Sequence, residues 1–503
     1  MPIARAWSVA LLGIQGRLVE VEADIGGGMP GVKLVGLPDA GLREAKDRVR
    51  SAVRNSNQEW PSEKVTLGLS PANLPKLGSG YDLAIAVAVL AAAGRVPTTR
   101  LLGTVLLGEL ALDGRLREVR GVLPGLLAAR NAGMKRAVVP APSLFEGALV
   151  DGLEVRGAAR LRDVVAWLHG ENALNSPDPP DEVEPPRVPD LADVLGQPEA
   201  RWALEVAAAG GHHLLLTGPP GVGKTMLAKR LPGLLPPLSV EESLEVTAVH
   251  SVHGSLSRTS PLISVPPFVA PHHSVSVAAL IGGGVGLPGP GLISRAHRGV
   301  LLLDEACEFA ADRLESLRTA LEEGEVRLAR SRGMVCYPAR FQLVLATNPC
   351  PCAPPREVDC CCSAAARRRY LSRLSGPLLD RVDLRVRMRP ITAMTTRQGD
   401  VPESTEVVRK RVLAARARAA ERWATHGWRT NAEVPGPALR REFALPSNVT
   451  ELLDRGLDRG LVTARGADRC LRLAWTLADL SEAARPDGDH VAAALEFRDR
   501  RAA

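Results

Sequence analysis

The chain has 503 residues, 45% of them hydrophobic and 24% charged, with a formal net charge of +7 and a pI of about 9.1. This length suffices for about three domains, and the positive charge favours an anionic partner only weakly. Aromatic residues make up only 3%, so contacts with nucleic acid would be electrostatic rather than a base-stacking platform. No segment reaches the ~18 apolar residues that span a bilayer, which predicts a cytoplasmic protein without a membrane partner.

The N-terminal part, residues 1–172, mixes strand and helix patterns. Apolar runs predict a buried strand over 32–37 and another strand over 64–70. One helix is expected to begin at an N-cap Asp39 and a later, apolar helix to end at Gly94, because aspartate favours helix starts and glycine favours helix ends. This mixture predicts an α+β domain.

A proline-rich acidic stretch, NSPDPPDEVEPPRVPD, lies within residues 173–190 and cannot bury a core, so we interpret it as a linker. Residues 191–390 alternate strands and helices, starting with a helix expected over 191–210, which predicts an α/β core. Residues 391–503 are helical and basic. Their arginine-rich helix is more typical of a solvated face than of a dedicated DNA-binding patch.

The strongest motif is GPPGVGKT, which follows the short apolar strand LLLT and precedes the helical segment MLAKRL. It fits the pattern G-x-x-x-x-G-K-[ST], in which the backbone N–H groups of a loop between strand and helix surround phosphates. Lys224 would neutralise β- and γ-phosphate oxygens of ATP, and Thr225 would ligate Mg²⁺. The predicted nucleotide-binding residues are Gly218, Pro219, Pro220, Gly221, Val222, Gly223, Lys224 and Thr225.

Two further apolar strands end in polar residues. The run GVLLLDEACEF (299–309) places Asp304 and Glu305 at a strand end, where open α/β sheets bind ligands. Asp304 would hold Mg²⁺, and Glu305 would activate the attacking water as general base. The run FQLVLATNP reaches Asn348, which would orient the water; an ordinary turn before Pro349 is the alternative.

One arginine is a candidate for catalysis across a subunit interface. Arg381 lies in SGPLLDRVDL, after two leucines and Asp380. Supplied to the nucleotide of a neighbouring subunit, it would stabilise charge in the transition state. From the spacing alone, a plain salt bridge explains this arginine equally well.

Five of the eight cysteines lie between Cys350 and Cys362. Clustered thiols in a reducing compartment indicate a metal rather than disulfides. Four thiolates would close a tetrahedron around a structural Zn²⁺, with a redox-active or vestigial cluster as the alternative. The candidate ligands form two C-x-C pairs, to which Cys361 adds an extra thiol: Cys350, Cys352, Cys360 and Cys362.

The remaining thiols and a pair of histidines are given structural roles. Adjacent histidines on a loop diverge, so His272 and His273 are expected to order their loop without a metal. Small buried hydrophobic positions are expected for the other three cysteines, Cys307, Cys336 and Cys470.

Seven segments, taken in order, resemble the magnesium-chelatase-like AAA+ ATPases of the YifB/ComM type: GPPGVGKT, APHHSVSVAALIGGG, GLISRAHRGVLLLDE, ALEEGEVRLAR, ATNPCPC, SGPLLDRVDL and TARGADRCLRLAWTLADL. The resemblance extends from about Arg5 to about Arg498. It implies a Lon-protease-like α+β N-terminal domain, an AAA+ P-loop α/β core with a cysteine insert at 350–362, and a C-terminal helical lid.

The same resemblance implies roles for single residues. Asn348 corresponds to sensor 1, Arg381 to the arginine finger, and Arg465 to sensor 2, which would bind the nucleotide. The family's two C-x-C pairs support zinc, although the loop between them is shorter here and CPCG reads CPCA. GEVRLARSRG matches a pore-facing hairpin, whose arginines either contact phosphate backbone or are ordinary exposed residues: Arg327, Arg330 and Arg332.

The N-terminal domain resembles that of Lon proteases through PKLGSGYDLAIAVAVLAAAG. The nucleophile position falls on Gly80, with Ser79 one place away, and the lysine position falls near Leu123 and Gly125. Because a Ser–Lys dyad needs both groups within hydrogen-bond reach, we expect a scaffold or regulatory domain without peptidase activity.

The sequence thus predicts an ATP-hydrolysing motor in a homo-oligomeric ring, with six subunits expected because an arginine finger acts across an interface. The resemblance to ComM implies DNA as the polymer moved, in helicase or branch-migration work during recombination or natural transformation. Alternatives are a magnesium-chelatase-like metal-insertion motor, a protein-remodelling ATPase and a nucleotide-gated scaffold. The N-terminal domain and the cysteine insert argue against the first, and the lack of an aromatic residue in GEVRLARSRG argues against the second.

Overall fold

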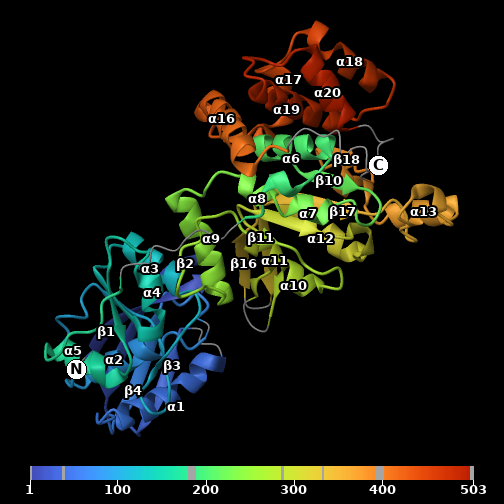
Figure 1. The fold of residues 1–503 in the computed structure, drawn as a ribbon. Helices are drawn as coiled ribbons and strands as arrows, with labels where there is room; N and C mark the ends of the chain where they lie inside the picture. Colours follow the sequence, from blue (N-terminus) through green and yellow to red (C-terminus); the bar gives the residue numbers. More distant parts are fainter. Residues whose placement is uncertain are drawn as a thin grey trace.

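A computed structural model describes residues 3–36, 40–76, 78–178, 188–284, 288–330, 333–390 and 402–498. Figure 1 shows three parts in chain order: an N-terminal domain in blue and teal, an α/β core in green through light orange, and a helical lid in deeper orange and red. The core lies between the other two parts, so the N-terminal domain and the lid occupy opposite sides of it.

The N-terminal domain is built on a mixed seven-stranded sheet in the order β3-β4-β2-β1-β5-β8-β9. β2 pairs antiparallel with β1 and β4, and the other neighbours are parallel. The strands, with a separate β6–β7 pair, are β1 (Ile3–Leu12), β2 (Gln15–Gly26), β3 (Gly31–Val35), β4 (Lys64–Ser70), β5 (Thr104–Leu106), β6 (Glu109–Leu110), β7 (Leu116–Arg117), β8 (Arg136–Pro140) and β9 (Glu154–Ala158).

Helices cover this sheet. Every residue of α2 is buried, as expected of a helix that is apolar on all sides. The helices are α1 (Ala40–Asn55), α2 (Asp82–Ala92), α3 (Val122–Asn131), α4 (Leu144–Gly147) and α5 (Leu161–His169).

Three local predictions in this domain have clear outcomes. The strand expected over 64–70 is β4, and the apolar helix stops just before Gly94, whose φ is +72°. The strand expected over 32–37 was wrongly called buried, because β3 is an edge strand whose residues alternate between exposed and half-buried. The expected N-cap Asp39 lies outside the described residues.

The α/β core contains a five-stranded parallel sheet in the order β11-β14-β17-β10-β18. All residues of β10, β14 and β17 are buried, as in sheets covered by helices on both faces. The strands are β10 (Leu214–Thr217), β11 (Phe268–Val269), β14 (Val300–Leu303), β17 (Gln342–Thr347) and β18 (Leu384–Arg387).

The core helices follow the strands in the expected alternation. They are α6 (Pro198–Gly210), α7 (Lys224–Ala228), α8 (Leu231–Leu234), α9 (Val240–His253), α10 (Val277–Ile281), α11 (Leu292–Arg295), α12 (Ala311–Glu323), α13 (Ala364–Leu371) and α14 (Gly376–Leu379). The single helix predicted over 191–210 is wrong in its first part. Gly196 and Gln197 both have positive φ, so the helix starts only at Pro198, whose fixed φ suits a first helical position.

Two antiparallel hairpins extend from the core: β12 (Gly282–Gly283) with β13 (Gly289–Pro290), and β15 (Glu325–Arg330) with β16 (Gly333–Pro338). The second hairpin packs against the N-terminal domain. A Cβ built on Gly13, in the β1–β2 turn, would come 2.3 Å from the Cys336 carbonyl oxygen. The backbones of the two domains therefore touch at a position that admits only glycine without a shift.

The helical lid shares one hydrophobic core with the α/β core. Trp423 is fully buried in the cluster that also holds Leu214 of β10 and Ala203 of α6. The lid helices are α16 (Thr405–Trp423), α17 (Gly436–Arg441), α18 (Ser447–Asp458), α19 (Ala464–Leu480) and α20 (Gly488–Glu496). Among the described helices, none combines the length and apolarity needed to cross a membrane.

A buried carboxylate joins the N-terminal domain to α9 of the core. The Leu123 amide donates to Glu146 Oε2 at 2.8 Å, and the Ser251 hydroxyl donates to the same oxygen at 2.5 Å. The Gly121 amide donates to the Ser251 carbonyl at 3.2 Å. Because Glu146 and Ser251 are both buried, these bonds lie away from water and define a fixed joint between the domains.

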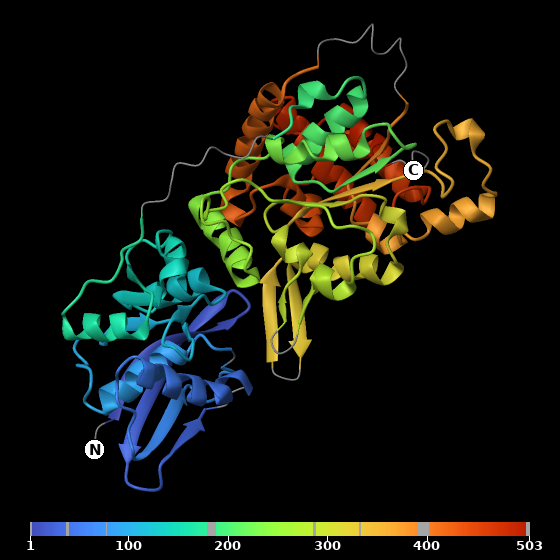
Figure 2. The same ribbon diagram turned by 60° about the horizontal axis from the view of Figure 1, so that its bottom comes forward.

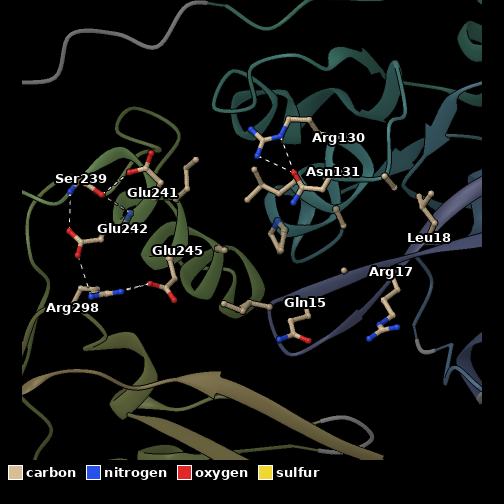
Figure 3. Close-up of a pocket in the computed structure, with 18 of the residues that line it drawn as sticks. Gln15, Arg17, Leu18, Arg130, Asn131, Ser239, Glu241, Glu242, Glu245 and Arg298 are labelled. Atoms are coloured by element: carbon tan, nitrogen blue, oxygen red, sulfur yellow. Dashed lines mark hydrogen bonds and ion pairs between the residues drawn. The ribbon is translucent and has the colours of Figure 1, made fainter. Parts of the chain in front are cut away.

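Beside this joint lies an open cleft of about 1160 Å³ (Figure 3). Arg17 and Arg130 lie on its N-terminal-domain wall, and Glu241 lies on the α9 wall. Arg298 pairs with Glu242 at 3.2 Å on the core side. The cleft therefore has one basic wall and one wall of largely neutralised acids.

Candidate nucleotide-binding site

The motif GPPGVGKT forms the loop between β10 and α7. Gly221 and Gly223 have φ values of +80° and +93°, which residues with a Cβ rarely adopt. A Cβ on Gly218 would come 2.6 Å from the Met388 carbonyl oxygen. The glycines therefore permit a tight turn between β10 and the N-terminus of α7, an arrangement suited to phosphates.

Lys224 is buried, and its ammonium group links this loop to β17. Its Nζ donates to the carbonyls of Gly218 and Pro219 at 2.6 and 2.8 Å and to Asn348 Oδ1 at 3.0 Å. Burial lowers the pKa of Lys224, and the negative charges of Asp304 and Glu305 oppose that shift. Three sequence-predicted residues, Lys224, Asp304 and Asn348, thus meet at one edge of the sheet.

Thr225 and Asp304 form the second contact of the site. The Thr225 hydroxyl donates to Asp304 Oδ2 at 2.6 Å, and Asp304 directly follows β14. Because β10, β14 and β17 are parallel neighbours, their carboxyl ends open at the same edge, where such sheets bind ligands. A hydroxyl and a carboxylate oxygen are hard ligands of the kind Mg²⁺ prefers, so this pair fits a Mg²⁺–ATP complex.

Glu305 is held in an unusual backbone conformation. Its φ is +52°, in the left-handed region that non-glycine residues seldom adopt, and its amide donates to Asp304 Oδ1 at 3.0 Å. The side chain is 57% exposed, so the carboxylate faces solvent at the sheet edge. Such local strain is frequent where a side chain must be aimed at a reacting group.

Two residues near the site were not predicted from the sequence to take part in the reaction. His273 Nδ1 lies 3.5 Å from Glu305 Oε2, and the His273 carbonyl accepts from Arg313 Nη1 at 2.7 Å, which fixes the loop. Gln197 donates to the carbonyls of Arg389 and Val222 at 2.6 and 3.4 Å and so ties the loop to the segment after β18. In the sequence, only the HH pair in APHHSVS indicates His273, and no local pattern indicates Gln197.

Arg381 is buried and held within its own subunit. It forms an ion pair with Glu322 of α12, and its Nη1 donates to the Pro377 carbonyl at 2.5 Å. Burial lowers the pKa of Arg381, and the positive charges of Arg318, Arg465 and Arg469 lower it further. The charge of Arg465 in the lid therefore acts on Arg381. The charges that act on Lys224 are a different set, namely Asp304 and Glu305.

The cysteine pairs come together as the sequence predicted. The sulfurs of Cys350, Cys352, Cys360 and Cys362 all lie within 4.8 Å of one another, and the Cys350–Cys352 distance is 3.4 Å. Four sulfurs bound tetrahedrally to zinc at ~2.3 Å would lie about 3.8 Å apart, so the donor set fits this metal. Cys361 is exposed and outside the group.

The remaining thiols divide into two kinds. Cys307 and Cys470 are fully buried, as expected of small hydrophobic residues. Cys336 was wrongly predicted to be buried: it is half-exposed on β16, and its Sγ donates to Glu325 at 2.9 Å.

The basic residues expected on the β15–β16 hairpin are only partly described. Arg327 pairs with Glu325 at 2.6 Å and with Glu323 at 3.4 Å, so two carboxylates neutralise it. The Arg330 side chain and Arg332 lie outside the described residues. Among the described side chains of the hairpin, the charge of Arg327 is therefore not available to a partner.

In the N-terminal domain, the positions expected for a Ser–Lys dyad do not hold a serine paired with a lysine. Ser79 donates to the Glu109 carboxylate, and Leu123 is buried in α3. The nearby Lys76 is fully buried, and its ammonium donates to the Pro71 carbonyl. The absence of peptidase activity stays a prediction.

Comparisons with known proteins agree with this architecture. Residues 190–396 match the family described as "Magnesium chelatase, subunit ChlI". Residues 21–143 match "Subunit ChlI of Mg-chelatase", and residues 402–498 match "Magnesium chelatase, subunit ChlI C-terminal". The three matches cover the N-terminal domain, the α/β core and the lid.

Curated relatives match over the whole length. The chain is 60% identical over 498 residues to the uncharacterized protein Rv2897c of Mycobacterium tuberculosis, covering 99% of both chains. It is 42% identical over 490 residues to YifB of Escherichia coli, covering 97% of this chain and 96% of the relative. It is 39% identical over 508 residues to the competence protein ComM of Haemophilus influenzae, covering 99% and 98%.

Partial matches point to the separate parts of the architecture. A Lon protease of Mycolicibacterium smegmatis is 27% identical over 174 residues, which cover 32% of this chain and 22% of that protein. The magnesium-chelatase 67 kDa subunit of Heliobacterium mobile is 30% identical over 189 residues, which cover 32% and 28%. The fold has the α/β core, the mixed N-terminal domain and the helical lid that the sequence predicted. Its full-length relatives and this fold show that the chain belongs to the YifB/ComM family of magnesium-chelatase-like AAA+ ATPases.

Proposed function

We propose that the protein is an ATP-hydrolysing ring motor that acts on DNA in recombination or natural transformation. The observation that carries the proposal is the convergence of Lys224, Thr225, Asp304 and Asn348 at one sheet edge. Lys224 would bind the β- and γ-phosphates of ATP. Thr225 and Asp304 would hold Mg²⁺, which supplies charge neutralisation on the phosphates when bound.

Glu305 and Asn348 are suited to act on the attacking water. The carboxylate of Glu305 would accept a proton from the water, and His273 would orient that carboxylate. Asn348 would hold the water near the γ-phosphate once the phosphates replace its oxygen as partner of Lys224. Both groups lie on strand ends rather than on long loops, which favours fixed positions during the reaction.

Arg381 and Arg465 support a ring rather than a monomer. They lie close enough to influence each other, and the charges that act on Lys224 are Asp304 and Glu305. Two arginines that lie this close to each other would together complete the nucleotide pocket of a neighbouring subunit. A closed ring, with six subunits expected, gives every nucleotide such a neighbour.

DNA is favoured as the partner for two reasons. The chain resembles the competence protein over 99% of its length, but the magnesium-chelatase subunit over only 32%. The net charge of +7 suits a polyanion. The metal-insertion motor and the protein-remodelling ATPase remain the competing functions.

The cysteine insert is proposed to hold a structural zinc. The four convergent sulfurs fit a closed tetrahedral site, and the insert has little apolar core of its own. Such a site would fix the segment between β17 and α13 without a direct part in hydrolysis.

The proposed function is tested by the ATPase rate with and without forked or four-way-junction DNA. The motor requires ATP hydrolysis that Lys224→Ala abolishes and that these DNAs stimulate. A neutral polymer serves as the control for crowding. Hydrolysis that no DNA stimulates would contradict the DNA function and leave the chelatase-like alternative.

A further inference from the structure

Helix α13 projects from the α/β core together with the cysteine insert. Figures 1 and 2 both show it at the margin of the molecule, away from the N-terminal domain and from lid helices α17 and α18. Its C-terminal end is anchored, because Tyr370 and Leu374 are buried in the core cluster that contains Leu343 and Leu345 of β17. The helix is therefore held firmly at one end and open to solvent along most of its length.

The N-terminal end of α13 is also fixed. Ser363 caps the helix by accepting a bond from the Ala366 amide at 3.2 Å. The preceding residue, Cys362, belongs to the four-sulfur group. The position of the helix is therefore determined by the insert on one side and by the core on the other.

Three consecutive arginines, Arg367, Arg368 and Arg369, cover the exposed part of α13, and we call them the α13 arginine face. Within the described part of the chain, no carboxylate forms an ion pair with any of them. Their charge thus faces solvent.

The other basic triplet of the chain, residues 409–411, is in a different state. Lys410 pairs with Glu406 at 3.1 Å, and Arg411 pairs with Glu205 and Glu403, each at 2.7 Å. Arg327 of the hairpin is likewise neutralised. Of the two triplets, the α13 arginine face is the one in which no residue forms an ion pair within the described part of the chain, so its charge is available to a partner.

We propose that the α13 arginine face binds the phosphate backbone of nucleic acid. Successive helix residues point about 100° apart, so the three guanidinium groups spread over roughly 200° of the exposed helix surface and suit charge spread along a polyanion. A protein interface would need an apolar centre, but the other exposed residues of α13 are Ala364 and Ala365. This assignment deepens the proposed DNA function and rests on it for the identity of the ligand.

The test measures DNA binding by the full chain carrying Arg367→Gln, Arg368→Gln and Arg369→Gln together. Fluorescence anisotropy of labelled duplex and forked DNA is recorded between ~50 and ~200 mM salt. We expect affinity to fall about tenfold or more on every sequence, and the slope of log K against log salt to decrease by about 2 to 3. The ATPase rate without DNA should not change.

Two matched variants sharpen the test. Arg441→Gln, Arg459→Gln and Arg485→Gln together remove the same charge from three exposed lid arginines that form no ion pair within the described residues, and should leave affinity within about twofold. Arg367→Lys, Arg368→Lys and Arg369→Lys together keep the charge and should restore binding. Unchanged affinity and salt slope in the α13 Gln variant would overturn the assignment.

Other outcomes would reassign the surface. Loss of ring assembly in the α13 Gln variant would make α13 a contact between copies of this chain, and loss of the basal ATPase rate would place it at a neighbour's nucleotide; either overturns the proposal. DNA that binds through α13 without stimulating hydrolysis would refute the motor function while supporting this surface. The two proposals can therefore fail separately.

Discussion

Lys224 Nζ donates to Asn348 Oδ1 at 3.0 Å, so the P-loop lysine and the residue after β17 share a direct hydrogen bond. The two residues are separated by most of the core sequence, and the bond exists because β10 and β17 are parallel neighbours. Nucleotide phosphates would compete with Asn348 for the ammonium group. This geometry gives the two residues separable roles.

Lys224→Ala should abolish nucleotide binding, whereas Asn348→Ala should bind ATP within a few-fold of the wild type and lower kcat by about 10²-fold. In the proposed mechanism the asparagine would position the attacking water, which matters only in turnover. Titration with a fluorescent ATP analogue and steady-state kinetics separate the two effects. Lys229→Ala, an exposed lysine just after α7, is the control. An Asn348→Ala enzyme with normal kcat would remove this residue from catalysis.

Glu305→Gln should bind ATP normally and lose hydrolysis by about 10²–10⁴-fold, because the amide cannot accept the proton of the attacking water. His273→Ala should have a smaller effect on kcat, since in the proposed mechanism His273 would orient Glu305 without accepting the proton itself. Glu308→Gln, a nearby carboxylate paired with Arg373, should hydrolyse ATP at the wild-type rate. Equal losses at positions 305 and 308 would indicate a general disturbance of the loop instead.

Arg381→Ala should bind ATP but hydrolyse it slowly if this arginine acts on a neighbouring subunit. Mixing Arg381→Ala subunits with Glu305→Gln subunits should then recover activity above either alone, because some interfaces pair an intact Glu305 with an intact Arg381. Mixtures of Glu305→Gln with Lys224→Ala should not recover, since both defects lie in the same half of the pocket. If the first mixture does not recover activity, Arg381 acts within its own subunit. Its ion pair with Glu322 of the same chain would agree with that result.

Purified protein should contain one zinc per chain, and Cys350→Ser or Cys360→Ser should lose it. Cys361→Ser should retain the metal, because its thiol lies outside the four-sulfur group. Elemental analysis by mass spectrometry measures the stoichiometry. Metal-free protein that melts at the wild-type temperature and hydrolyses ATP normally would argue against a structural role.

Glu146→Ala should lower the free energy of unfolding by about 1–3 kcal/mol, because it leaves the Leu123 amide and the Ser251 hydroxyl without their buried acceptor. Glu146→Gln should behave differently, since its amide oxygen can still accept both bonds. Burial raises the pKa of Glu146 above its ordinary value of 4.5. The folded state therefore binds this proton more tightly than the unfolded state, and the wild type loses stability as pH rises from 4.5 through the raised pKa.

Near pH 7, Glu146→Gln should therefore melt at or above the wild-type temperature, with the difference shrinking as the pH falls toward 4.5. Scanning calorimetry across this pH range measures the effect. Glu59→Gln, at the exposed Glu59–Arg95 pair of the N-terminal domain, is the control, because Glu59 is not among the charges that act on Glu146. A Glu146→Gln protein that melts well below the wild type at neutral pH would show that the charged carboxylate stabilises the joint.

The sequence alone determined the local parts of the site. The order of strand, glycine loop and lysine in GPPGVGKT is typical of one loop conformation, and the apolar runs before Asp304 and Asn348 favour buried strands. Short separations likewise keep the two thiols within each C-x-C pair close. In each case the information lies within a few neighbouring residues.

Only the tertiary structure decided which distant residues met. His273 beside Glu305, Arg381 beside Glu322, and Glu146 bonded to Ser251 join segments whose spacing carries no signal. The same holds for neutralised charge: the triplet at 409–411 and the triplet on α13 look alike in sequence. Folding brings carboxylates to Lys410 and Arg411 of the first and leaves the second facing water, because ion pairing depends on proximity in space and not along the chain.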